Sequence, residues 1–213
     1  VRRLKDEIVD ADGKPEFVTR LPAEALEVDY TDVERAGHDL LNRYSALRTS
    51  SPTRNDLVTL LLKKRLFSSP AAFQKTLAAH ARTVRGVTDR GETDPTDIDY
   101  EWDDEPDDAV GSDAEGALLA ATATNINTAA SAALDELIRW ADQRVGPADN
   151  KAERLVAELR SICQPDGHWD DERVVVFTEY RDTQIWLAGL LNARGLGGDR
   201  LGLLFGGMDT NAR

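Results

Sequence analysis

The sequence has a single cysteine, Cys163, among its 213 residues, so no disulfide can form within the chain. Long apolar runs are also missing. The longest are only a few residues, whereas a membrane-spanning helix needs roughly 20. There is no signal-peptide core and no Arg- and Ser-rich transit segment. These absences favour a reducing, cytoplasmic setting.

The common catalytic motifs are absent as well. The sequence contains no GxxxxGK[ST], no GxGxxG, no CxxC pair, no GxSxG and no HExxH. The three histidines, His38, His80 and His168, are far apart and have ordinary helix or loop neighbours. We therefore expect structural or solvated roles for them rather than catalytic ones.

Charge is divided unevenly along the chain. The formal net charge is −13, but residues 89–115 alone hold thirteen acidic residues against one basic residue. Residues 35–88 hold ten basic residues against two acidic ones. The sign of the total therefore cannot identify a partner for the folded part. The acidic segment has too few aliphatic residues to offset the cost of ordering it, so we expect a disordered loop there.

A calcium site in the acidic segment is the main metal-binding alternative. Asp97, Asp99 and Glu101 alternate as the ligands of a calcium loop do, but Trp102 stands where such a loop requires glycine for its sharp turn. We therefore expect no metal site in this chain.

Most of the chain is predicted to be helical. Weak alternation with a turn at Asp12-Gly13-Lys14 predicts short strands before residue 30. Thr31 and Glu34 form a capping box, and Ser69-Pro70 is a favourable helix start. We expect helices over residues 31–48, from about 57 onward, over 70–84, within 117–145 with a break near 124–128, and from 149 or 150 onward.

The last third of the chain has a different pattern. Residues 174–177 and 201–205 are short apolar runs that predict strands buried on both faces, and a helix ending at Gly195 separates them. Strand, helix and strand in about thirty residues form one right-handed, parallel βαβ unit. The expected fold class is therefore α/β and mostly helical, with an incomplete parallel sheet.

The ends of these two strands are candidate ligand-binding positions. Thr178, Tyr180 and Arg181 follow the first strand at the start of the next helix, and Gly206-Gly207 follows the second. Ligands of open α/β sheets bind in the crevice at the carboxyl ends of the strands, and a helix N-terminus attracts anions. The alternative is that both turns are plain connections.

A basic cluster, Lys63-Lys64-Arg65, is a second candidate. Cations on a helix can neutralise the phosphates of a nucleic-acid backbone and release counterions. The alternatives are a solvated helix face or an internal partner for the acidic segment.

Longer strings resemble a known family. VVVFTEYRDTQIWLAGLLNARGLGGDRLGLLFGGMDTNAR resembles motif IV and the following segment of the second RecA-like lobe of superfamily-two helicases, particularly the Swi/Snf-like ATPases and their RapA-like branch. LLLKKRLFSSPAAFQKTL is similar to a helical insertion of RapA-like helicases, and Asp149-Asn150-Lys151 to the start of the helix before motif IV. Arg2-Arg3-Leu4-Lys5 and Leu21-Pro22 resemble the exit from the first lobe.

The resemblance implies an ATP-driven translocase acting on double-stranded DNA or DNA–RNA structures. The phosphate-binding loop and acidic box of such a protein are expected before Val1 and its arginine finger after Arg213, so ATP and Mg²⁺ belong to the longer protein and this fragment should not hydrolyse ATP. The implied segments are 1–30, the end of the first lobe; 31–88, a basic helical insertion; 89–116, an acidic loop; 117–148, an Ala-rich helical segment; and 149–213, the start of the second lobe.

The resemblance also implies roles for the candidate residues. Thr178, Tyr180, Arg181 and the Gly206-Gly207 turn would contact the nucleic-acid backbone near motif IV, and the basic helices would grip the duplex. We expect the acidic loop to compete with DNA for those helices. A helical protein-interaction module that uses the acidic loop to bind a basic partner is the main alternative, and the truncated sheet argues against a free-standing α/β ligand-binding domain.

Overall fold

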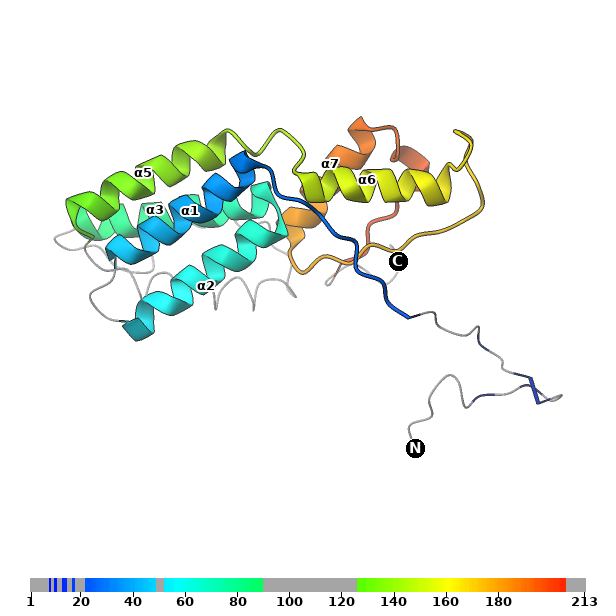
Figure 1. The fold of residues 1–213 in the computed structure, drawn as a ribbon, viewed down its shortest axis with the longest axis horizontal. Helices are drawn as coiled ribbons and strands as arrows, with labels where there is room; N and C mark the ends of the chain where they lie inside the picture. The colour runs from blue at the N-terminus through cyan, green and yellow to red at the C-terminus, as the bar shows by residue number, and fades with distance from the viewer. Residues whose placement is uncertain are drawn as a thin grey trace.

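The computed structural model describes residues 8, 10, 13, 14, 17, 22–48, 52–89 and 126–205. Six α-helices and one short 3-10 helix lie within these residues, and no strand does. The elements are α1 (Asp32–Arg48), α2 (Pro52–Ser68), α3 (Pro70–Asp89), α5 (Thr128–Asp142), α6 (Asn150–Cys163), α7 (Arg181–Ala193) and η2 (Gly198–Arg200) (Figure 1). The mostly helical character predicted from the sequence is confirmed.

Local capping signals set the helix starts. The backbone N–H of Thr31 donates to Glu34 Oε2 at 2.6 Å, and the N–H of Glu34 donates to Thr31 Oγ1 at 3.2 Å, so the predicted capping box is present. Side-chain oxygens also cap three later helices: Ser69 for α3, Asn127 for α5 and Asp149 for α6. α1 ends at Arg48 as predicted, whereas α3 continues about one turn past its predicted end.

The region before α1 contains the predicted turn but no strand among its described residues. Lys14 N–H donates to Asp10 Oδ1 at 2.9 Å, and Gly13 has a φ of 78°, which favours glycine. Residues 22–30 are described and form no strand, so the strand prediction fails there. The weak alternation provided too little apolar surface to pair these residues in a sheet. Apart from residues 8, 10, 13, 14 and 17, the rest of the predicted strand region lies outside the described residues.

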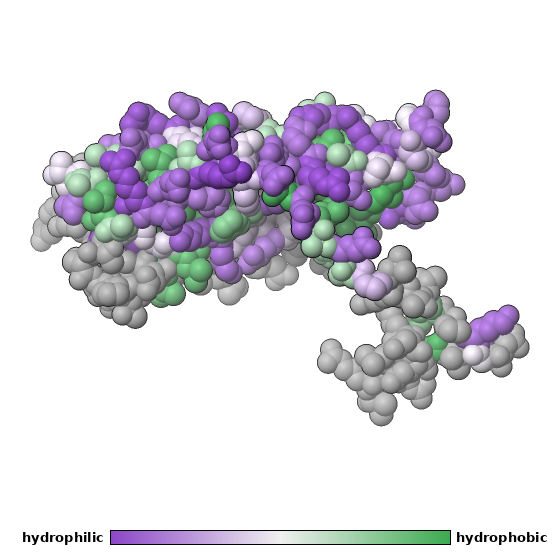
Figure 2. Space-filling view, in the orientation of Figure 1, coloured by the Kyte–Doolittle hydropathy of each residue, from purple (hydrophilic) through white to green (hydrophobic). Residues whose placement is uncertain are grey.

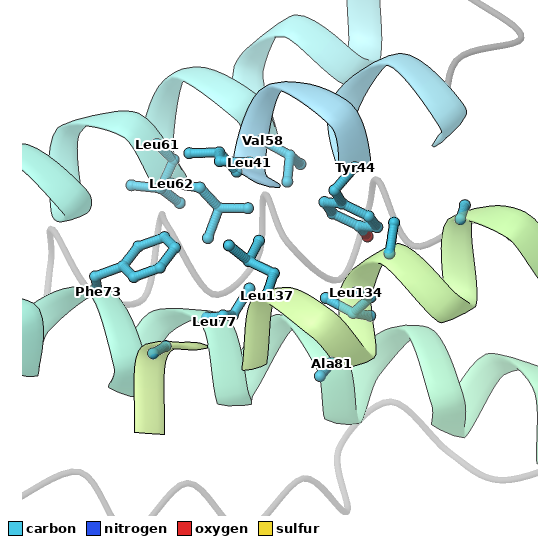
Figure 3. Packing of buried hydrophobic residues seen from close by; sticks show 13 residues of the cluster. Leu41, Tyr44, Val58, Leu61, Leu62, Phe73, Leu77, Ala81, Leu134 and Leu137 are labelled. Carbon is cyan, nitrogen blue, oxygen red and sulfur yellow. The ribbon is translucent and has the colours of Figure 1, made fainter. Parts of the chain in front are cut away.

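Four helices, α1, α2, α3 and α5, pack into a bundle around one core. Thirteen buried residues form it: Leu41, Tyr44, Val58, Leu61, Leu62, Phe73, Leu77, Ala81, Ala130, Ala133, Leu134, Leu137 and Ala141 (Figure 3). Burying a large aliphatic or aromatic side chain contributes about 1.5–3 kcal/mol. α5, from the Ala-rich segment, therefore belongs to the same packed unit as the basic helices.

α1 and α5 approach closely at Gly37. A Cβ built on Gly37 would lie 2.3 Å from the Trp140 ring, so only glycine leaves room for the indole here. Trp140 Nε1–H donates to the Val33 carbonyl of α1 at 3.0 Å. The tryptophan thus fills the space left by the missing side chain and fixes the spacing of the two helices.

The bundle also encloses a polar cluster of Tyr44, Arg48 and His80. The Tyr44 hydroxyl lies 2.7 Å from His80 Nε2, and both side chains are fully buried. Burial, and then the charge of Arg48, lower the pKa of His80 to about 3, while burial raises the pKa of Tyr44 to about 12. His80 is therefore neutral near pH 7, and the imidazole tautomer decides which atom donates in the hydrogen bond between its Nε2 and the tyrosine hydroxyl.

A smaller core lies between α6 and α7. Val156, Leu159, Leu187, Leu191 and Leu196 form it. Two polar contacts tie this pair of helices together and to the preceding loop. Arg194 donates to Glu153 at 2.8 Å, and Trp186 Nε1–H donates to the Val145 carbonyl at 3.1 Å.

The two predicted strands of the βαβ unit are not formed among the described residues. Residues 174–177 and 201–205 are coil, and no backbone hydrogen bond joins one segment to the other. They are not buried: Val175 is 73% exposed, Phe177 90% and Leu204 72%. Figure 2 shows hydrophobic surface gathered beneath α6. A strand buried on both faces needs neighbouring strands and two covering layers, and the described residues supply neither.

Candidate functional site

The structure brings the two sequence-predicted groups of site residues together. Lys64 Nζ on α2 lies 3.3 Å from Glu179 Oε1, in the turn before α7. The guanidinium carbon of Arg65 lies 3.7 Å from the centroid of the Tyr180 ring. We call the residues at this contact the α2–α7 junction. It consists of residues from α2, α3 and the link between them (Lys64, Arg65, Ser68, Ser69 and Lys75) and residues from the turn before α7 and α7 itself (Glu179, Tyr180, Asp182 and Thr183).

Three hydroxyl groups form the centre of the junction. Thr183 Oγ1 lies 2.7 Å from Ser68 Oγ and 2.8 Å from Ser69 Oγ. Ser69 is fully buried, and its Oγ also accepts a hydrogen bond from the backbone N–H of Ala72 at 3.1 Å. The residue that caps α3 therefore also holds the first turn of α7, so these hydrogen bonds join the helical bundle to the start of α7.

Two ion pairs flank the hydroxyl groups. Lys64 pairs with Glu179, and Lys75 Nζ pairs with Asp182 Oδ1 at 2.8 Å. Both lysines are about half exposed, and exposed ion pairs of this kind contribute about 0–1 kcal/mol to stability. Their main effect is therefore electrostatic, because each carboxylate neutralises the charge of its lysine.

Arg65 and Tyr180 are packed against each other rather than presented to solvent. Arg65 is 6% exposed and Tyr180 is 9% exposed. The guanidinium over the ring is a cation–π contact, which is stronger when it is desolvated. Direct contact of either side chain with a phosphate therefore requires the junction to open.

The other two predicted turn residues lie at the start of α7. Thr178 Oγ1–H donates to the Tyr180 carbonyl at 3.3 Å. Arg181 donates to Gln184 and stacks over the Phe205 ring, with its guanidinium carbon 3.6 Å from the ring centroid. Tyr180, the N-cap residue of α7, provides no side-chain cap to the helix.

The end of the second predicted strand lies beside the same turn. Gln184 Nε2–H donates to the Leu204 carbonyl at 2.8 Å, and Phe205 carries the Arg181 contact. Gly206 and Gly207 themselves lie outside the described residues. The described residues just before them therefore lie at the first turn of α7.

Lys63, the remaining residue of the basic cluster, lies beside the junction. It is partly exposed, and no acidic side chain among the described residues pairs with it within 4 Å. Burial lowers the pKa of His38, Asp39 opposes that shift, and the charge of Lys63 adds to it. The charge of Lys63 on α2 is therefore felt at His38 on α1.

A second set of polar contacts joins α6 to the bundle. Lys151 Nζ donates to the carbonyls of Phe67 and Ser68 at the C-terminus of α2, and burial lowers the pKa of Lys151. The backbone N–H of Asn150 donates to Glu34 Oε1 at 2.8 Å. Burial alone would raise the pKa of Glu34, but hydrogen bonds from Asn150 and Thr31 outweigh it and lower that pKa.

Sequence reasoning missed the contacts that build this site. It identified Ser69 as a cap and placed Thr183 in the turn after the first predicted strand, but it did not pair these two residues, and it assigned no role to Asp182. The one signal was the resemblance of Asp149-Asn150-Lys151 to a lysine-led helix start. No pattern along the chain gives pairings more than 80 residues apart, such as that between Lys151 and Phe67.

The described residues contain no cluster of three or more His, Cys, Asp or Glu side chains that could hold a metal ion. None of the described helices combines the length and hydrophobicity of a membrane-spanning segment. Comparison of the chain with protein-family models, with curated proteins and with solved structures gave no match. Function is therefore inferred from the residues of the α2–α7 junction themselves.

Proposed function

We propose that this chain is the part of a Swi/Snf-type, ATP-dependent nucleic-acid translocase that joins its two RecA-like lobes. The observation that carries the proposal is the contact of Lys64 and Arg65 with Glu179 and Tyr180. The sequence predicts nucleic-acid contact separately for the basic cluster of α2 and for the turn before α7, and residues of both lie in one junction. A translocase needs such a link, because lobe movements must reach the elements that hold the duplex.

The chemistry of the junction suits an exchangeable polyanion. Lys63 is partly exposed and Lys64 is exposed on α2, and Lys75 is exposed on α3. Each phosphate that such a lysine neutralises releases counterions and strengthens binding at low salt. In the free protein Lys64 forms an ion pair with Glu179, so duplex binding replaces the carboxylate partner of Lys64 by a phosphate.

The parallel βαβ unit is part of the same proposal. Residues 174–177 and 201–205 would be neighbouring parallel strands, with α7 as the crossover helix, in a sheet completed by further strands. Their exposed apolar side chains support this, since parallel strands are ordinarily covered on both faces. The contacts of Gln184 and Arg181 with Leu204 and Phe205 already hold the second segment at the start of α7.

ATP and Mg²⁺ are proposed only for the longer protein. The residues of this chain do not fit a nucleotide site: the sequence has no phosphate-binding GxxxxGK[ST] loop, and the described residues offer no cluster of acidic ligands. The role proposed for the chain itself is to bind the duplex and to couple it to the second lobe.

A salt titration of duplex binding tests the proposal. The chain is titrated into fluorescently labelled duplex DNA between about 50 and 200 mM salt, and the slope of log affinity against log salt is compared with that of Lys64→Gln. Removing one phosphate contact should weaken binding and reduce the slope by about 0.9. The matched control is Arg154→Gln on α6, which also removes a half-exposed cation paired with a glutamate.

Equal slopes for Lys64→Gln and the wild type, or no duplex binding at about 50 mM salt, would contradict the proposal. Deletion of residues 89–116 separates it from the protein-interaction alternative. The proposal predicts tighter duplex binding after the deletion, because a competing polyanion is gone. An interaction module would instead lose its basic protein partner.

A further inference from the structure

The outward side of α2 is apolar, although the other side of this helix already faces the bundle core. Leu57, Leu60 and Phe67 are 48%, 54% and 51% exposed. Lys64 lies between them, and spacings of three, four and three residues place all four on one side of the helix. We call these four residues the α2 outer row. A surface helix ordinarily turns polar side chains to solvent, so this row departs from the usual pattern.

Two aromatic rings from α1 and the segment before it extend the row at its Phe67 end. The Phe67 ring lies 4.8 Å from the His38 ring, which lies 5.5 Å from the Tyr30 ring, both measured between centroids. Both neighbouring rings are partly exposed. Single exposed apolar residues are ordinary, whereas a contiguous apolar surface indicates an interaction site. The α2 outer row and these two rings form such a surface.

Lys63 places a positive charge beside the row. Lys64 pairs with Glu179, whereas no acidic side chain among the residues that the structure describes pairs with Lys63. The charges of Lys63 and, with the opposite sign, Asp39 of α1 act on His38. A partner that covers the row should therefore place its carboxylates beside Lys63 and away from α1.

The dimensions of the row match a single helix. From Leu57 to Phe67 it is about 15 Å long, or roughly three helical turns. Three half-exposed side chains offer much less than the roughly 800 Å² per partner of a standard protein–protein interface. A helix whose apolar side chains recur at spacings of three and four residues can cover such a row. A second copy of the chain fits less well, because two outer rows packed against each other bring their lysines together.

We propose that the α2 outer row is the docking site for one acidic amphipathic helix of a partner protein. The apolar side chains of that helix cover Leu57, Leu60 and Phe67 and pack on the aliphatic stem of Lys64, and its carboxylates meet Lys63. The docked helix and a nucleic acid would compete for the two lysines. The inference is independent of the proposed function, because the docking requires no nucleic acid.

Titration of the full chain with a synthetic helical peptide tests the docking. The probe has about 18 residues, with leucines at spacings of three and four and glutamates beside them, and the matched control peptide has lysines in place of the glutamates. At up to about 1 mM glutamate peptide, the methyl resonances of Leu57 and Leu60 should shift, whereas those of Leu159 in the α6–α7 core should not. The lysine peptide should bind roughly tenfold more weakly, since attraction becomes repulsion. Equal binding of the two peptides, or no shift at Leu57 and Leu60, would overturn the inference.

Two variants and a control locate the site. Leu60→Asp should weaken binding of the glutamate peptide by tenfold or more, because a carboxylate in the row is desolvated and repels the glutamates. Lys63→Glu should reverse the preference between the two peptides. The matched control is Ile162→Asp in the last turn of α6, where another exposed aliphatic side chain is replaced and binding should remain that of the wild type (Figure 1). An unreversed preference in Lys63→Glu, or equal loss in Leu60→Asp and the control, would contradict the proposal.

Two further measurements address other occupants of the row. Without peptide, the resonances of Leu57 and Leu60 should be the same at high and low protein concentration, and phosphatidylserine vesicles should leave them unchanged. Shifts that depend on protein concentration would assign the row to a second copy of the chain. Shifts with vesicles that Leu60→Asp abolishes would assign it to a membrane surface. Either result would overturn the proposal.

Discussion

Mild acid should destabilise the helical bundle through His80. The side chain is fully buried, and its pKa falls from 6.5 to about 3 because burial, and then the charge of Arg48, oppose protonation. The unfolded chain takes up the proton near pH 6.5, while the folded chain does not. Above pH 6.5 the histidine is neutral in both states and does not change the free energy of unfolding. As the pH falls from 6.5 toward 3, the free energy of unfolding decreases.

The loss amounts to about 1.4 kcal/mol for each pH unit in this window, or about 2 kcal/mol at pH 5. We would measure urea unfolding by circular dichroism at about pH 7.5, 6 and 5 for the wild type and for His80→Gln. Glutamine is neutral throughout and its side-chain oxygen can accept from the Tyr44 hydroxyl, which preserves the contact at Nε2. Between pH 6.5 and 5, the free energy of unfolding of the variant should fall by about 2 kcal/mol less than that of the wild type.

The matched control is His168→Gln, because His168 is an exposed histidine. This variant should keep the pH dependence of the wild type. All other titrating groups are common to the three proteins and cancel when they are compared. If His80→Gln and the wild type lose stability in parallel between pH 6.5 and 5, the reasoning about the buried histidine is refuted.

Two further predictions concern packing. Gly37→Val should lower the free energy of unfolding, measured in urea, by about 1–3 kcal/mol, because its Cβ would overlap the Trp140 ring. Gly86→Ala has open space around it and should stabilise α3 by about 0.5–1 kcal/mol. An unchanged stability of Gly37→Val would contradict the close approach of α1 and α5. Lys151→Met should lower stability by about 1–3 kcal/mol and speed amide hydrogen exchange at Ser69, because two carbonyls at the C-terminus of α2 lose their donor. Unchanged exchange at Ser69 would refute that role.

The parts of the fold that could be predicted are those encoded within a few residues. The capping box of Thr31 and Glu34 and the Ser69-Pro70 start depend on side chains and backbone groups three residues apart. The starts of α1 and α3 followed from these signals, whereas α2 begins at Pro52, before its predicted start near residue 57. The end of α3 did not, because nothing local marks where a helix rich in good helix formers stops.

The strands and the site contacts depend on distant partners. The run of residues 174–177 predicted a buried strand from its composition, but composition does not supply the neighbouring strands that would bury it. Similarly, the sequence identified Arg65 only as one of three adjacent cations. Its place against Tyr180, over 100 residues later, follows from the meeting of α2 with α7.

The central claim is that Glu179 and Asp182 hold junction lysines that serve a nucleic acid. The most direct measurement is the affinity of the double variant Glu179→Gln/Asp182→Asn for duplex DNA at about 50 mM salt, compared with that of the wild type. The account predicts binding tighter by roughly tenfold, since two ion pairs of up to about 1 kcal/mol each no longer compete with phosphate. Unchanged or weaker binding by a variant that remains folded would contradict it.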